Sequence, residues 1–174
     1  MTAPDGDSAP DRGNVDPATS PHAGTEWPVR GYRTSDWMRG LELGISPAGF
    51  AAHLLDPHPR SVRQARRFLQ HCLSQWQLPA PVDSATLVVS ELSTNALQHS
   101  RTPGSGPVWL AIILYTEELI CAVADPSPKP PRTQSLAPLS EAGRGLHVIA
   151  ALSSSWGWSP SPPPGKIVWA RIPL

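Results

Sequence analysis

Apolar and polar positions follow two different periods along the chain, and these periods predict where helices and strands lie. Apolar residues recur at helical spacing over residues 62–76 and again over residues 84–99, which predicts two amphipathic helices. Ser61 and Asp83 are residue types that favour the N-cap, so we expect the two helices to begin after them. A third, shorter helix is expected over residues 146–152.

Short apolar runs bounded by turn residues predict the strands. Residues 49–56 form the first run, and the runs 108–114 and 119–124 are joined by a tight polar turn, which indicates an antiparallel hairpin. The segments 156–158 and 167–172 indicate a closing hairpin. One of these runs is apolar at successive positions, so both of its faces need cover in the folded protein.

The proline content separates the chain into regions. Proline accounts for 22 of the 174 residues, against a usual share of about 5%, so part of the chain must be loop or tail. We expect residues 1–48 to be a disordered or loosely attached N-terminal tail and residues 49–174 to form one domain. The segment from Pro126 to Ala142 is a long loop, of a length that is usually functional or disordered.

The charge distribution limits the class of partner. The 14 basic and 14 acidic residues cancel, so a whole-chain basic footprint is absent and direct nucleic-acid binding is not expected. Up to His58 there are eight acids and four bases, so this part carries −4 and the rest +4, which suits an anionic ligand or an acidic partner. No leader segment and no apolar run of about 20 residues is found, so we expect a cytoplasmic protein without membrane contact.

Polar residues at unusual positions suggest a binding site. Glu91 and Asn95 interrupt the apolar side of the second helix, and a hydrated divalent cation would satisfy both. Asp125 ends a strand, where a carboxylate can accept a hydrogen bond from a ligand amino group. Gly143 and Gly145 precede the third helix, whose free N–H groups suit a phosphate. Together these residues describe a nucleotide site of a kind that lacks a P-loop.

Three motifs in this order resemble the boxes of a known superfamily. Residues 91–100 (ELSTNALQHS) resemble the N-box of the gyrase/histidine-kinase-like (GHKL) ATPases, and within them the anti-sigma-factor serine/threonine kinase branch. Residues 123–127 (VADPS) resemble the G1 box of that branch, and residues 143–146 (GRGL) resemble its G2 box. The resemblance covers residues 49–174. It implies an α+β fold: a two-layer α/β sandwich of the Bergerat type, with a mixed, mainly antiparallel sheet and helices on one face.

The resemblance also implies a role for the residues that match. Glu91 would orient or deprotonate the attacking hydroxyl or water, and Asn95 would ligate a Mg²⁺ ion that bridges the phosphates. Asp125 would accept a hydrogen bond from the adenine amine. The other positions that the motifs place at the nucleotide are His99, Ser127, Gly143, Arg144, Gly145 and Leu146.

The function implied by the resemblance is that of a serine/threonine protein kinase, a transferase that uses ATP and Mg²⁺. Such a protein controls transcription by partner switching with a sigma factor or a small anti-sigma antagonist protein, and the resemblance also allows a homodimer. One alternative is a non-catalytic interaction module of the same fold, because residues 125–129 lack the glycines that the superfamily's G1 box often carries. A second is the orphan ATPase domain of a histidine kinase, for which His71 lacks the acidic residue that follows a phosphoacceptor.

Overall fold

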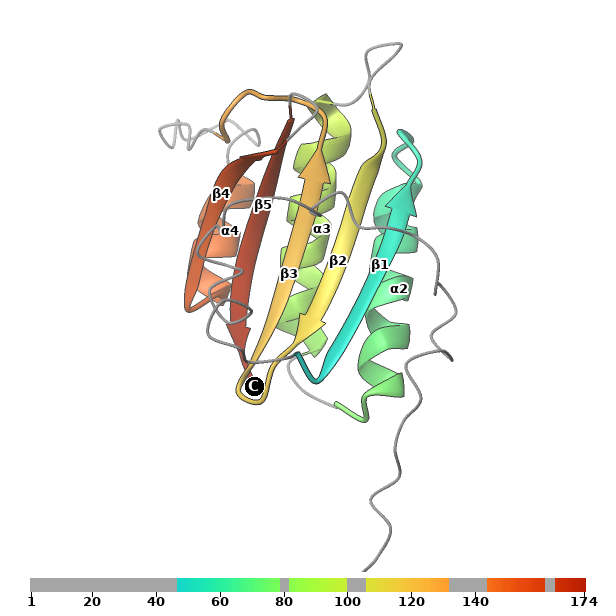
Figure 1. Cartoon of the computed structure of the whole chain (residues 1–174), viewed down its shortest axis with the longest axis vertical. Helices are drawn as coiled ribbons and strands as arrows, with labels where there is room; N and C mark the ends of the chain where they lie inside the picture. The colour runs from blue at the N-terminus through green and yellow to red at the C-terminus, as the bar shows by residue number, and fades with distance from the viewer. Residues whose placement is uncertain (1–46, 79–81, 100–105, 132–143, 162–164) are drawn as a thin grey trace, which may run out of the picture.

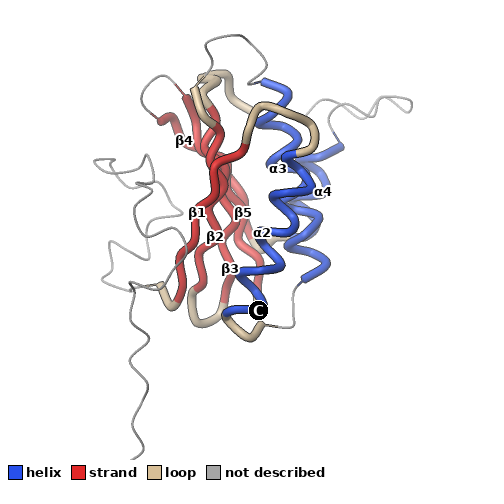
Figure 2. Tube along the Cα trace, turned by 90° about the vertical axis from the view of Figure 1, so that its right-hand side faces the viewer, coloured by secondary structure: helices blue, strands red, loops and turns tan. Residues whose placement is uncertain are grey.

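The computed structural model describes residues 47–78, 82–99, 106–131, 144–161 and 165–174. Within them the elements are, in order, β1 (Gly49–Leu55), α2 (Ser61–Gln75), α3 (Val82–His99), β2 (Val108–Leu114), β3 (Glu118–Asp125), α4 (Arg144–Leu152), β4 (Ser155–Ser161) and β5 (Gly165–Pro173). The strands form one sheet in the order β1-β2-β3-β5-β4, and the described helices cover one of its faces (Figures 1 and 2). The two-layer α+β fold is therefore confirmed. The tail expected over residues 1–48 lies, up to residue 46, outside the described residues.

The sheet is antiparallel at every pairing between the described strands, whereas we expected a mixed, mainly antiparallel sheet. The physical reason is the connectivity: β2–β3 and β4–β5 are hairpins, and the two hairpins meet where β3 pairs antiparallel with β5. In that pairing Asp125 lies directly opposite Lys166. The end of β3 and the start of β5 thus lie side by side at one end of the sheet (Figure 1).

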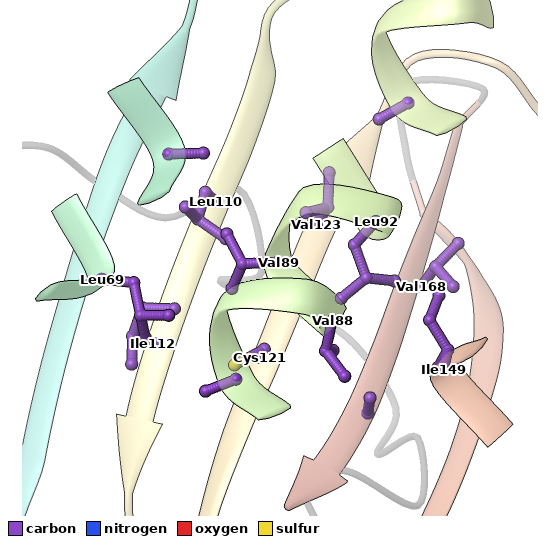
Figure 3. Packing of buried hydrophobic residues seen from close by; sticks show 14 of the residues in the cluster. Leu69, Val88, Val89, Leu92, Leu110, Ile112, Cys121, Val123, Ile149 and Val168 are labelled. Atoms are coloured by element: carbon purple, nitrogen blue, oxygen red, sulfur yellow. The ribbon is translucent and has the colours of Figure 1, made fainter. Parts of the chain in front are cut away.

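Both faces of the central strands are buried, as the apolar run predicted. The larger hydrophobic core lies between the sheet and the helices, and Figure 3 shows Val88 and Leu92 of α3 in it with Val123 and Val168 of the sheet. A smaller cluster on the opposite face includes Trp169. Because side chains alternate along a strand, Asp125 follows Val123 onto the helix-facing side, and Lys166 shares that side with Val168.

The N-terminal end of α2 lies one residue before its predicted start, and that of α3 lies two residues before its predicted start. Ser61 is the first residue of α2 rather than its N-cap, and its side chain is buried. The preceding turn is instead closed by His58, whose Nδ1 accepts from the Arg60 N–H at 3.1 Å and whose carbonyl accepts from the Ser61 N–H at 2.9 Å. Asp83 lies inside the first turn of α3, where its negative charge favours the helix dipole. No described helix has the length and apolar character needed to cross a membrane.

The two cysteines are buried in the core, as their apolar neighbours predicted. Burial raises the pKa of the Cys72 thiol on α2 to about 12. Burial, with a smaller contribution from Cys72, also raises the pKa of the Cys121 thiol on β3. Both thiols are therefore protonated at neutral pH and serve packing rather than chemistry.

Candidate functional site

Glu91 and Asn95 lie one turn apart on α3, and both side chains are half-buried where α3 meets α4. Gly145 of α4 lies against both of them. A Cβ atom added at Gly145 would lie 2.6 Å from Glu91 Oε2, 3.4 Å from Asn95 Nδ2 and 3.6 Å from Asn95 Oδ1. The first of these distances is shorter than real Cβ contacts, so any side chain at this position would displace the Glu91 carboxylate. The structure thus brings the predicted N-box and G2 box into direct contact.

The first turn of α4 faces this contact. We expected Gly145 to precede the helix, but α4 begins at Arg144, so Gly145 is its second residue. Glycine allows helical backbone angles, and the helix therefore starts earlier than the apolar pattern of residues 146–152 suggested. The N–H groups of a first helical turn have no acceptor within the helix and favour anions. This arrangement places the first turn of α4 beside the Glu91 and Asn95 side chains.

The neighbours of Gly145 in the predicted G2 box point to different environments. The Arg144 side chain is exposed, whereas the Leu146 side chain is buried in the core. Leu146 therefore has only its backbone to offer to a ligand. Gly143 lies outside the described residues, and of His99 only the backbone, as the last residue of α3, is described.

Asp125 forms a buried ion pair at the end of β3. Its Oδ2 accepts from Lys166 Nζ at 2.5 Å, and the two side chains are 2% and 3% exposed, respectively. Lys166 Nζ also donates to the Ser127 carbonyl at 3.0 Å. Buried charges are stable only when they are paired and hydrogen-bonded, and this geometry meets both conditions.

Lys166 is a site residue that the sequence reasoning missed. The available signal was a lysine that directly precedes the apolar run 167–170, because a lysine at the start of a buried strand needs an acidic partner. That partner, Asp125, is 41 residues away in the sequence. Only the pairing of β3 with β5 brings the two together.

The segment after Asp125 is held in place without glycine. The Ser127 N–H donates to Asp125 Oδ1 at 2.6 Å, and the Lys129 N–H donates to the Ser127 hydroxyl at 3.4 Å. These side-chain-to-backbone hydrogen bonds form two successive turns. They bend the chain after Asp125 without a glycine.

The predicted residues thus lie in two groups on the helix-facing side of the sheet. One group, Glu91, Asn95 and Gly145, lies between α3 and α4. The other, with Asp125 and Lys166, lies at the end of β3 beside the start of β5, in front of α3 in the view of Figure 1. Among the described residues no cluster of three or more His, Cys, Asp or Glu could hold a metal ion by itself.

Comparison with protein families shows which family the chain belongs to. A family model for the histidine kinase-like ATPase domain matches residues 55–172. The chain belongs to this family. The matched range runs from the last residue of β1 into β5, so it contains both groups of side chains. No curated protein matches the chain.

Membership of the histidine kinase-like ATPase family implies ATP binding, usually with Mg²⁺. The residues present fit these ligands. The Asn95 amide oxygen and the Glu91 carboxylate are oxygen ligands of the kind that Mg²⁺ prefers, and the missing Cβ of Gly145 lets both side chains lie against the first turn of α4. Each carboxylate oxygen of Asp125 accepts one hydrogen bond from a described residue, although it has two lone pairs. Each Asp125 carboxylate oxygen therefore has one lone pair that no described residue uses.

Proposed function

We propose that this protein is an ATP–Mg²⁺-dependent serine/threonine protein kinase that regulates transcription by partner switching with a sigma factor or a small anti-sigma antagonist protein. The observation that supports it most is the contact of Gly145 with Glu91 and Asn95, because it joins a carboxylate, a side-chain amide and a helix N-terminus. Phosphoryl transfer requires these components and little covalent chemistry from the protein.

In this proposal each site residue has a defined role in phosphoryl transfer. Glu91 Oε2 accepts the proton of the serine or threonine hydroxyl of the partner as that oxygen bonds to the γ-phosphorus and the bond to ADP breaks. Asn95 would hold the Mg²⁺ ion through its amide oxygen. When bound, Mg²⁺ would neutralise part of the negative charge of the phosphates. The N–H groups in the first turn of α4 bind the phosphate chain, and Asp125 accepts from the adenine amine.

Substitution of Glu91 tests the catalytic part of the proposal. Glu91→Ala removes the proton acceptor, so we expect phosphoryl transfer from [γ-³²P]ATP to antagonist proteins or to a serine/threonine peptide array to fall about a hundredfold or more. ATP affinity measured by calorimetry should change less than threefold. Gln98→Ala, an exposed position on the same helix, is the matched control and should retain full transfer. Transfer that survives Glu91→Ala would contradict the kinase mechanism.

A non-catalytic interaction module of the same fold is the second candidate. It is favoured by the Asp125–Lys166 ion pair, because the carboxylate expected at the adenine already has a buried partner. The absence of glycine from the turns at residues 125–129 favours it as well. Calorimetry of the wild-type protein with ATP–Mg²⁺ separates the two candidates, since the interaction module predicts no heat of binding at millimolar ATP.

A further inference from the structure

We propose that Lys166 reads the base of the nucleotide: its ammonium group donates a hydrogen bond to N1 of adenine while Asp125 accepts one from the neighbouring 6-amino group. This inference rests on the proposed function, since it concerns the same nucleotide site. It adds Lys166 as a specificity-determining residue that neither the motifs nor the family match assigns.

The Lys166 ammonium group has more hydrogen-bond donors than its described partners use. A lysine ammonium group has three N–H donors. Two are used, toward Asp125 Oδ2 at 2.5 Å and the Ser127 carbonyl at 3.0 Å. The described residues offer no acceptor for the third. The Lys166 side chain is only 3% exposed, so a ligand acceptor that reached this third donor would form a hydrogen bond sheltered from water.

Asp125 and Lys166 lie on the same side of the sheet as the rest of the candidate site. Asp125 and Lys166 are direct partners across antiparallel strands, so both project from the same, helix-facing side of the sheet. That side also carries the contact between Glu91 and Gly145. Two hydrogen bonds with the Ser127 backbone fix both side chains in position: Lys166 Nζ donates to the Ser127 carbonyl, and the Ser127 N–H donates to Asp125 Oδ1.

The Asp125–Lys166 pair offers a hydrogen-bond acceptor and a donor side by side. An acceptor, the Asp125 carboxylate, lies directly beside a donor, the Lys166 ammonium. The pairing edge of adenine presents the complementary order, an amino donor beside the N1 acceptor, and proteins commonly read a base along this edge. Because water is excluded from a pair that is 2% and 3% exposed, each hydrogen bond to the base discriminates more strongly than it would in water.

Nucleotide analogues test this assignment on the unmodified protein. In 1-deaza-ATP the N1 acceptor is replaced by C–H, whereas 7-deaza-ATP keeps the pairing edge and loses only N7. By calorimetry with Mg²⁺ we expect 7-deaza-ATP to bind within threefold of ATP. We expect 1-deaza-ATP to bind at least about tenfold more weakly, the effect of one hydrogen bond to a charged group.

The Lys166→Met variant shows whether the discrimination belongs to this side chain. The variant should bind ATP and 1-deaza-ATP with the same affinity. Because Lys166→Met leaves Asp125 buried without a partner, the double variant Asp125→Asn with Lys166→Met is prepared beside it, and circular dichroism checks the fold of both. Either folded variant should lose the preference for ATP over 1-deaza-ATP.

The outcomes distinguish this inference from the proposed function. Equal affinity of the wild type for ATP and 1-deaza-ATP overturns the role of Lys166 and leaves ATP binding intact. A tenfold preference that persists in the Lys166 variants overturns it as well. If the wild type binds none of the three nucleotides, the proposed function fails and the inference fails with it.

Discussion

Gly145 has two opposing effects in the first turn of α4: it weakens the helix, and it leaves space for the Glu91 carboxylate. Glycine weakens a helix relative to alanine, because the unfolded chain has more freedom to lose. The missing side chain, however, lets Glu91 Oε2 lie where a Cβ atom would be 2.6 Å away. Glycine at this position therefore favours the placement of the carboxylate over the stability of the helix.

Gly145→Ala should separate these two effects. We expect the free energy of unfolding, measured in urea, to change by less than about 1 kcal/mol, because the gain in helix propensity offsets the displacement of Glu91. Phosphoryl transfer should fall at least tenfold, since Glu91 loses its position. Gly106→Ala is the matched control, because its Cβ would meet Pro126 at an ordinary 3.5 Å. Unchanged transfer by Gly145→Ala would show that the contact has no functional role.

At the level of elements, the β4–β5 hairpin packs through a glycine and a tryptophan. Gly157 of β4 lies directly opposite Trp169 of β5. The Trp169 ring belongs to the cluster on the face away from the helices and covers Gly157, where an added Cβ would lie 2.7 Å from Cζ2 and 3.1 Å from Cε2. The edge strand is thus held by ring packing as well as by its backbone ladder.

Gly157→Ala should destabilise this hairpin. The new methyl group overlaps the Trp169 ring, so we expect a loss of about 1–3 kcal/mol in the free energy of unfolding. Ser159→Ala on the same strand is the control and should cost less. Combined with Trp169→Leu, the Gly157→Ala substitution should cost less than the sum of the two single changes, because they share one contact. Additive losses would mean that the ring does not limit this position.

At the scale of the whole molecule, the most buried part of the sheet is around β3. Seven of the eight residues of β3 are buried, and β3 pairs with β2 on one side and β5 on the other. β4 is an edge strand with one buried residue. The core between sheet and helices therefore extends outward from β3 and thins toward β4.

Native-state hydrogen exchange should follow this gradient. We expect the amides of β3 to exchange only through global unfolding, whereas those of β4 exchange through local opening at lower free energy. Exchange followed by NMR over a series of urea concentrations measures both. Equal protection of β3 and β4 would mean that the sheet opens as one unit.

Local sequence patterns were sufficient to predict the helices and strands and part of the candidate site. The helical spacing of apolar residues located the ends of α2 and α3 to within two residues, because burial of one helix face places an apolar residue at every turn. Glu91, Asn95 and Asp125 stood out because a polar group in an apolar setting needs a partner. The family membership that these residues suggested is confirmed by the match over residues 55–172.

The partners of these residues were decided by the tertiary structure. The ion pair of Asp125 with Lys166 depends on the register of β3 with β5, and the contact of Gly145 with Glu91 depends on how α4 packs on α3. Periodicity in a sequence records how each element is exposed to solvent, but it carries no information on which distant residue fills the space opposite. Long-range register and packing supply that information only when the whole core forms.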